Sequence, residues 1–228
     1  MAHARPVVVD GNNHRVARAA VVCGYSVSLR ISDAERGIGR DDRRMAENMF
    51  PDVVLRTARL TLRALRDDDV DAIVVAASDP ITQRWLPLPD PYTREHAVCF
   101  VHETAPAARA SGDGLIRAIE FDGVLVGVID LKATDWRHRE TEIGYWAAPA
   151  VRARGVMTEA ATVLSRWVLT EAAFERVVLR IAPDNKASIR VAQKAGFTYE
   201  GIARNAGIVH AGRVDLAIYS LIPADLPV

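Results

Sequence analysis

The sequence predicts an α+β fold, a mixed and mostly antiparallel sheet with one parallel strand pair and flanking helices. Three observations carry this prediction. Runs of alternating apolar and polar residues follow one another between residues 115 and 147, with turn residues between them. Apolar residues then recur at helical spacing from 157 to 168. The next apolar run, 176–182, follows that helix, so its strand runs parallel to the one before the helix.

The elements before residue 112 are predicted from periodicity and capping. Leucines at 60, 62 and 65 indicate a first strand, and three aspartates at 67–69 suit the positive end of a helix running to residue 77. Residues 79–92 contain four prolines and are predicted to be a long loop. There Trp85 and Leu86 line a substrate entrance, or Trp85 fills the core beneath the loop. Thr93 caps a helix over 93–110.

Turn residues divide the second half of the chain. Asp122 and Gly123 predict a tight hairpin between strands 115–120 and 124–131, and Gly127 indicates a bulge or a close backbone approach. Pro149 ends the strand that begins at residue 140. A last helix over 186–194 ends at Gly196, and final strands are predicted at 197–201 and 214–222.

The turn at 152–158 is the strongest candidate for a binding site. The first N–H groups of a helix have no internal partner, so that end attracts anions. Gly155 allows close approach, and Arg152 and Arg154 add two positive charges. The turn therefore suits a cofactor that carries a pyrophosphate. The alternative is a solvated turn with two surface arginines.

Two motifs connect this turn to a known family. The pattern Arg152-x-x-Gly155-x-Met157 resembles the coenzyme A pyrophosphate loop of the GCN5-related N-acetyltransferases (GNAT superfamily), and residues 181–197, with Asn185 and Ser188, resemble the second signature of that superfamily. Within the superfamily, the sequence of this second motif is most similar to the branch of ribosomal-protein alanine and serine N-terminal acetyltransferases. The resemblance covers roughly residues 54–222. Ala153 and Met157 stand where smaller residues are usual, which would make the loop stiffer and its floor more crowded.

The resemblance implies a GNAT-like fold in which the fourth and fifth strands splay apart and admit acetyl-CoA as cosubstrate. Unpaired backbone groups near residues 143–146 would then bond the pantetheine amide and polarise the thioester carbonyl. The residues implied in cofactor binding are Ile143, Tyr145, Arg152, Arg154, Gly155, Val156, Met157, Thr158, Asn185 and Ser188.

Acetyl transfer needs a proton acceptor for the amine and help for the departing thiolate. Glu142 is the candidate general base, with a structural salt bridge or a solvent-facing position as alternatives; Glu140 faces the same way, nearer the strand edge. Ser188 matches the serine that this branch carries beside the cofactor sulfur, and the alternative is that it caps the last helix. Ala192 stands where other members carry a tyrosine acid.

The sequence does not identify the amine that accepts the acetyl group. The branch often carries a glutamate where Gly207 stands, which weakens transfer of the ribosomal-protein substrate, and His210 nearby is expected to be a solvated loop residue. Tyr145 and Tyr199 are expected to be core or rim aromatics. The leading function is direct acetyl transfer to a primary amine of a peptide, protein or small molecule. The alternative is a non-catalytic acyl-CoA-binding regulatory module.

Composition limits the partners. Lys plus Arg and Asp plus Glu both number 29, so net charge gives no support for nucleic-acid or membrane-surface binding. Two cysteines in no metal-ligand spacing predict no metal site and favour the cytoplasm. No apolar run reaches membrane-spanning length. A homodimer is a further expectation.

The N-terminal segment is predicted to lie outside the acetyltransferase domain, which is placed at 53–224. Residues 33–44 are dense in charges of both signs and poor in apolar residues. We therefore expect residues 1–44 to be a disordered extension, or a mis-assigned start upstream of Met45 or Met49.

Overall fold

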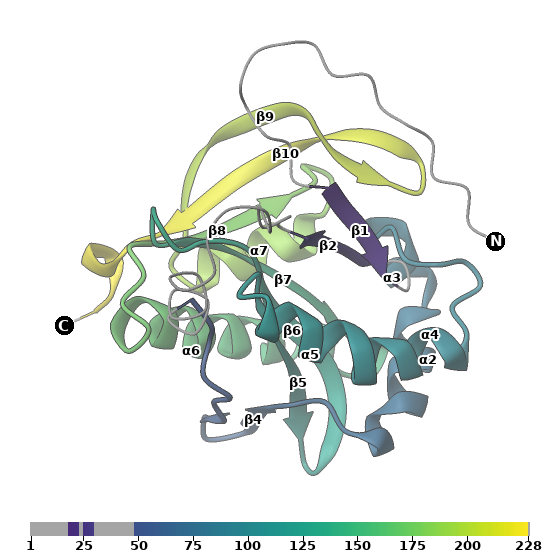
Figure 1. Cartoon of the computed structure of the whole chain (residues 1–228). Helices are drawn as coiled ribbons and strands as arrows, with labels where there is room; N and C mark the ends of the chain where they lie inside the picture. The colour runs from purple at the N-terminus through teal and green to yellow at the C-terminus, as the bar shows by residue number, and fades with distance from the viewer. Residues whose placement is uncertain (1–17, 23–24, 30–47, 228) are drawn as a thin grey trace, which may run out of the picture.

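The computed structural model describes residues 18–22, 25–29 and 48–227. Its centre is a sheet of strand order β3-β4-β5-β6-β7-β8-β10-β9 (Figure 1). Every neighbouring pair is antiparallel except β7 and β8, which confirms the predicted mixed sheet. The strands are β3 Leu55–Arg56, β4 Leu60–Arg63, β5 Leu115–Phe121, β6 Val124–Asp135, β7 Glu140–Ala147, β8 Arg176–Ile181, β9 Thr198–Val209 and β10 Gly212–Leu221.

Helices connect the strands and, except for the helix at Pro80–Trp85, lie where the sequence predicted them. A 3-10 turn at Asp67–Asp69 leads into the first helix, and a π-helical turn at Phe100–Thr104 joins two segments into one continuous helix. Short 3-10 turns also follow β7 and β10, at Pro149–Val151 and Pro223–Asp225. The α-helices are α2 Val70–Ala77, α3 Pro80–Trp85, α4 Arg94–Cys99, α5 Ala105–Ala110, α6 Val156–Thr170 and α7 Lys186–Lys194.

The sheet has a hydrophobic core on each face. On one face α6 buries Leu164 and Val168 against strand residues such as Ile143. On the other, α2 and α4 pack with Trp146 of β7, whose side chain points to the opposite side from Ile143. Figure 1 shows α6 on one side of β5 and β6, and α2 and α4 on the other. The three layers bury both faces of β7, so its two sets of side chains meet different surroundings.

Local turn chemistry follows the sequence. Asp122 and Gly123 both have positive φ, 51° and 78°, as a tight hairpin between β5 and β6 requires. A Cβ on Gly127 would lie 2.6 Å from the Trp146 carbonyl oxygen, and the β5–β6 register shifts beside it. The predicted close approach and bulge are both confirmed. Gly196, with φ 88°, follows the last helix.

Two predicted segments are wrong. Residues 79–92 are not wholly loop, because Asp79 caps helix α3 and Pro80 occupies its first turn, where proline is tolerated. The final strands are much longer than predicted: β9 and β10 continue through 202–213 as one hairpin that turns at His210 and arches over the sheet in Figure 1.

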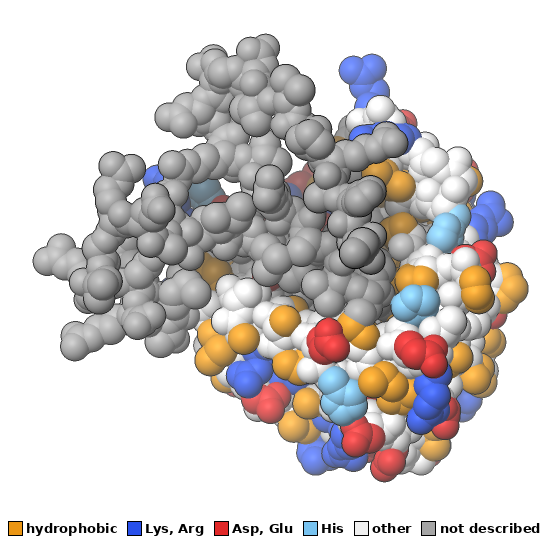
Figure 2. All heavy atoms as spheres, turned by 45° about the vertical axis from the view of Figure 1, so that its right-hand side comes forward, with side chains coloured by type: hydrophobic (Ala, Val, Ile, Leu, Met, Phe, Trp, Pro, Cys, Tyr) orange, Lys and Arg blue, Asp and Glu red, His pale blue; other side chains and the backbone are white. Residues whose placement is uncertain are grey.

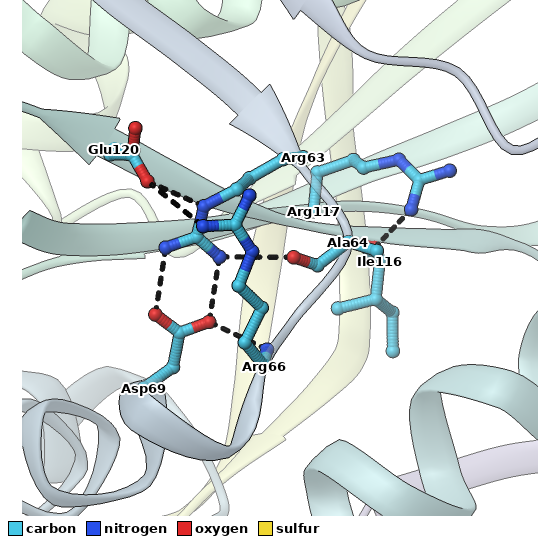
Figure 3. A network of polar contacts seen from close by, with 7 residues as sticks. All are labelled: Arg63, Ala64, Arg66, Asp69, Ile116, Arg117 and Glu120. Carbon is cyan, nitrogen blue, oxygen red and sulfur yellow. Dashed lines mark hydrogen bonds and ion pairs between the residues drawn. The ribbon is translucent and has the colours of Figure 1, made fainter. Parts of the chain in front are cut away.

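A buried ion pair fastens β4 to the start of the first helix (Figure 3). The Arg63 guanidinium donates to both carboxylate oxygens of Asp69, at 2.8 and 2.9 Å, and its Nε donates to Glu120 at 2.6 Å. Arg63 is 5% exposed and Asp69 3% exposed. The Asp69 bond raises the pKa of Arg63 despite burial, so the guanidinium stays charged.

Part of the N-terminal segment that was expected to be disordered forms strands. Strands β1 Arg18–Val22 and β2 Tyr25–Leu29 pair as an antiparallel two-stranded sheet, within the segment expected to be disordered. The remainder of residues 1–44, and the charged run 33–44, lie outside the described residues. The domain boundary at 53–224 stays a prediction.

The surface in Figure 2 carries interspersed Lys or Arg, Asp or Glu, and His side chains with apolar ones between them, without a patch of one sign on its coloured part. No helix in the described part of the chain is long and apolar enough to cross a membrane. Across residues 18–22, 25–29 and 48–227, no group of three or more His, Cys, Asp or Glu side chains is placed to hold a metal ion.

Candidate active site

Strands β7 and β8 separate soon after they meet. They pair at three positions, the last joining Glu142 and Val178, although β7 continues to Ala147 and β8 to Ile181. Beyond that point β7 keeps its ladder with β6, and β8 keeps its ladder with β10. The facing backbone edges of the two strands thus lose each other as partners and can pair with an extended ligand. The splay implied by the family resemblance is present.

A cavity of about 910 Å³ occupies this opening. Its lining comes from β7, β8, the start of α6, α7, α3 and the β9–β10 hairpin. All the predicted site residues except Arg154 line it. The sheet therefore brings residues 142–145, the turn at 152–158 and the start of α7 around one space.

The turn before α6 has the backbone geometry of an anion site. Gly155 is the N-cap residue, has φ 78° and provides no side-chain cap, so the first amides of α6 are left for a ligand. A Cβ here would meet only Arg59 Nη2, at 3.7 Å, so the left-handed φ, not crowding, favours glycine. Arg59 also bonds the Arg154 carbonyl at 3.4 Å and Glu159 at 2.5 Å, which steadies the turn.

The two arginines of this turn have other partners. The Arg154 guanidinium lies over the Phe121 ring, 5.4 Å from its centroid. Arg152 forms an ion pair with Asp79 and also donates to Thr82 Oγ1 at 3.2 Å and to the Ala147 carbonyl at 3.3 Å. The anion site of the turn is thus built from amides more than from arginine side chains.

At the start of α7, Asn185 and Ser188 divide their roles. Asn185 Oδ1 accepts a hydrogen bond from Ser188 N at 3.1 Å and caps the helix, so the alternative that Ser188 is the cap is wrong. Ser188 Oγ instead donates to the Tyr145 hydroxyl at 3.1 Å. Burial raises the pKa of Tyr145 to about 12, although the Ser188 bond opposes it. The phenol therefore stays protonated, and two hydroxyls meet inside the opening.

Tyr145 was expected among the cofactor-binding residues, but the sequence did not show that its hydroxyl meets Ser188. Tyr145 was expected to be a core or rim aromatic, and its ring does pack against the core on the α6 side. Its hydroxyl, however, lies in the cavity beside Ser188. Nothing in the local pattern shows this, because β7 and α7 meet only in the folded sheet. Tyr199, by contrast, is 52% exposed and packs on Tyr219.

Glu142 lies on the opposite face of β7 from Tyr145, in a charged cluster. Its carboxylate is 3.4 Å from Lys132 Nζ and 3.8 Å from Arg180 Nη1, and its side chain is 17% exposed. Glu142 lines the cavity, and it also has the salt bridge that was the alternative to a catalytic role. Glu140 lies outside the cavity lining and pairs with Arg176 Nε at 2.8 Å.

The structure adds two cations that the sequence prediction omitted. Arg190 and Lys194 project from exposed positions on α7 and line the cavity, and neither has an ion pair with a residue in the described part of the chain. Lys186, Arg190 and Lys194 are spaced four residues apart. This spacing in the sequence could have indicated that one face of the helix is basic. Arg190 and Lys194 provide positive charge free for an anionic ligand.

The outer wall of the cavity comes from α3 and the β9–β10 hairpin. Trp85 and Leu86 line it and are partly exposed, which favours the predicted entrance over the alternative that Trp85 is core. Gly207 also lines it, but without a side chain, beside Ile208. His210 is exposed, and its Nε2 lies 2.9 Å from Gln83 Oε1 of α3. The two walls thus touch at the hairpin tip.

The N-terminus of α6 and the gap between β7 and β8 line the same cavity, so together they offer an extended, anionic ligand both an anion site and backbone partners. The chain belongs to the acetyltransferase (GNAT) domain family, whose family model matches residues 59–198. It is an N-acetyltransferase by class, and the comparisons favour this over a non-catalytic binding module.

Curated relatives carry the same class name. The uncharacterized N-acetyltransferase YoaA of Bacillus subtilis (strain 168) is 29% identical over 176 residues, which cover 76% of this chain and 98% of that protein. The putative ribosomal N-acetyltransferase YdaF of the same organism is 34% identical over 110 residues, 48% of this chain. The matching stretch spans 60% of YdaF, less than two thirds of its length.

Solved structures agree on the fold. A probable acetyltransferase is 27% identical with a TM-score of 0.68, and the match covers 76% of this chain and 99% of that chain. The ribosomal L7/L12 α-N-protein acetyltransferase RimL, solved in complex with coenzyme A, gives a TM-score of 0.68 at 23% identity, covering 75% of this chain and 98% of RimL. The second likeness shows the fold alone.

Proposed function

We propose that this enzyme transfers the acetyl group of acetyl-CoA to the α-amino group of a protein or peptide. The observation that carries the proposal is the separation of β7 and β8 after Glu142, directly beside the open N-terminus of α6. The gap suits an extended pantetheine chain and the helix end suits its diphosphate. When bound, the cosubstrate supplies an activated acetyl thioester.

Each part of the cofactor has residues that suit it. The amides of Val156, Met157 and Thr158 face the diphosphate, and Gly155 keeps them accessible. Backbone groups of Ile143 and Tyr145, together with Asn185, suit the pantetheine arm. The free cations of α7, Arg190 and Lys194, suit its remaining phosphate. Arg152 and Arg154 lie in the same turn and contribute positive charge near the diphosphate.

The proposed chemistry uses both faces of β7. An α-amino group has a pKa of about 8. At neutral pH most of it is protonated, so it must lose a proton before it attacks. Glu142 accepts that proton, directly or through water, from the face that carries Lys132 and Arg180. On the other face the Tyr145 hydroxyl accepts the Ser188 hydrogen at 3.1 Å and donates to the Ser188 carbonyl at 3.4 Å, and in the proposed reaction it turns its own hydrogen to the departing sulfur. Base and hydroxyl donors therefore approach from opposite sides.

A peptide or protein acceptor is favoured by two findings. The E. coli relative with 28% identity over 98 residues is named a ribosomal-protein-serine acetyltransferase, and YdaF carries a similar name. Among lining side chains, five are Lys or Arg and one is Glu: Lys132, Arg152, Arg180, Arg190, Lys194 and Glu142. Glu142 is the one carboxylate among the described lining residues, so the cavity lacks the acidic surface that would attract polycationic amines such as polyamines and aminoglycosides.

Thiol release tests the proposal. The protein is mixed with acetyl-CoA and, separately, peptides beginning with Ala or Ser, a polyamine and an aminoglycoside. Release that depends on a peptide, with the acetyl group found on its α-amine by mass spectrometry, is expected; release with a polyamine alone would contradict the acceptor. Binding of acetyl-CoA without release across the panel would indicate a sensor. A chelator should leave the rate unchanged, since no metal takes part in the proposed chemistry.

Two further parts of the proposal concern the setting of the enzyme. We place its activity in the cytoplasm, where acetyl-CoA and newly made proteins occur together. A homodimer is also proposed, with the β9 edge as the surface to examine. That edge strand exposes Tyr199, Ile202 and Ile208. Light scattering during size-exclusion chromatography measures the oligomeric state directly.

A further inference from the structure

Arg152, the first residue of the turn before α6, is bound to helix α3 on the outer wall of the cavity. Arg152 Nη2 contacts Asp79 Oδ1 in an ion pair and donates to Thr82 Oγ1 at 3.2 Å. Its Nε donates to the carbonyl of Ala147, the last residue of β7, at 3.3 Å. One side chain thus joins the end of β7 and the turn before α6 to helix α3.

Asp79 has two duties in this contact. The same Oδ1 atom accepts hydrogen bonds from the amides of Ile81 and Thr82, at 3.1 and 3.2 Å, and so caps α3. The Arg152 bond, followed by the bond from the Thr82 amide, lowers the pKa of Asp79 against the effect of burial. Side-chain exposures are 27% for Arg152 and 15% for Asp79, so water screens the pair only in part. The Asp79 carboxylate therefore already balances the charge of Arg152.

Helix α3 is held at its other end by the hairpin. Gln83 Oε1 meets His210 Nε2 at 2.9 Å, and Gln83 Nε2 donates to the carbonyls of Ala77 and Pro89. Between these contacts α3 turns Ile81 and Trp85 toward the cavity. We call α3 the acceptor wall and the turn at residues 152–158 the cofactor turn. The position of the acceptor wall thus depends on the cofactor turn at one end and on the tip of the β9–β10 hairpin at the other.

We propose that Arg152 is a positioning residue, which couples the cofactor turn to the acceptor wall through Asp79, and is not a ligand of the diphosphate. The inference rests on the proposed function. Cofactor binding steadies the turn, and the turn then steadies α3 through the ion pair. The two binding sites therefore assist each other.

The test uses the full chain with coenzyme A and the variants D79N and R152Q. Asparagine keeps the cap of α3 but removes the charge, so D79N breaks the ion pair without removing the cap. D90N is the matched control, since Asp90 is exposed and lies on the same segment. Hydrogen exchange of residues 80–86, calorimetric affinity for coenzyme A, and KM for the peptide acceptor are measured.

In the wild-type protein and D90N, coenzyme A should slow exchange in residues 80–86. In D79N and R152Q that protection should be lost and KM for the acceptor should rise about tenfold, with coenzyme A affinity changed less than about threefold. Affinity about tenfold weaker in R152Q, with D79N unchanged in every readout, would overturn the inference. Failure of the wild type to bind coenzyme A would instead overturn the proposed function, and this coupling with it.

Discussion

At the scale of single residues, the proposed mechanism depends on which face of β7 a side chain occupies. Glu142 and Tyr145 are an odd number of positions apart, so the pleat sends them to opposite faces. Glu142 meets Lys132 and Arg180, whereas Tyr145 meets Ser188. In the proposed mechanism, one strand thereby presents a proton acceptor to one side of the gap and a hydroxyl donor to the other.

The Glu142→Gln substitution tests the base. Gln keeps the shape but cannot accept the proton, so kcat should fall by about 10²–10⁴-fold with little change in affinity for acetyl-CoA. Steady-state kinetics and calorimetry measure the two effects. Glu140→Gln is the matched control, because Glu140 lies on the same strand but pairs with Arg176 outside the cavity. A Glu142→Gln enzyme with wild-type kcat would remove this assignment.

The site residues were predictable where local geometry decides them. Gly155 and Asn185 could be recognised because a helix start needs a permissive backbone or a capping side chain. The Tyr145–Ser188 and Arg152–Asp79 contacts could not, because their partners are 43 and 73 residues apart in the chain. Contacts at such separations follow from packing of the whole sheet.

At the scale of elements, the turn before α6 relies on one left-handed glycine. Gly155→Val adds a branched side chain at φ 78°, which costs about 1–2 kcal/mol and crowds the amides proposed to bind the diphosphate. Affinity for coenzyme A, measured by calorimetry, should fall at least about tenfold.

Gly123→Val separates the two effects. Gly123 has the same φ of 78° but lies in the β5–β6 turn with no atom near an added Cβ. Both variants should lose similar stability, and only Gly155→Val should lose affinity. Equal affinities for the two variants would contradict the role of the turn.

The junction of β8, β9 and β10 contains a pH-sensitive carboxylate. Arg176, and then Ser220, lower the pKa of Glu200 to about 2 from 4.5. Because the folded pKa is lowered, this contact stabilises the fold above the unfolded pKa and the stabilisation is lost as pH falls toward the folded value. The stability difference between wild type and Glu200→Gln should therefore shrink as pH falls from about 4.5 to about 2.

Thermal unfolding at several pH values measures that difference. Glu175→Gln, on an exposed residue before β8, is the control and should show no such trend. A constant difference between Glu200→Gln and wild type across this range would contradict the role of the ion pair. Glu200 is 38% exposed, so solvent screening keeps the effect modest.

Elements with strong periodicity were predictable, and the two wrong segments show the limit. Four prolines between residues 79 and 92 favoured a loop, yet Pro80 suits the first turn of α3 once Asp79 caps it. Glycines within 201–212 hid the long hairpin, whose strands gain stability from pairing with each other and with β8. Tertiary pairing outweighed local propensity in that hairpin.

At the scale of the whole molecule, two hydrophobic cores cover the faces of the sheet, and the Arg63–Asp69 pair joins β4 to the segment before α2. Asp69→Ala leaves a buried guanidinium without its bidentate partner, so the free energy of unfolding should fall by about 3–5 kcal/mol. Asp68→Ala, on an exposed neighbour, should cost less than about 0.5 kcal/mol. Urea denaturation measures both, and equal losses would contradict the importance of this pair.

The central claim is that coenzyme A lies between β7 and β8 with its diphosphate on the first amides of α6. A crystal structure of the protein with coenzyme A tests it most directly. We expect the diphosphate within hydrogen-bond distance of the Val156, Met157 and Thr158 amides and the pantetheine chain along β7. Coenzyme A bound elsewhere, with that helix end empty, would contradict it.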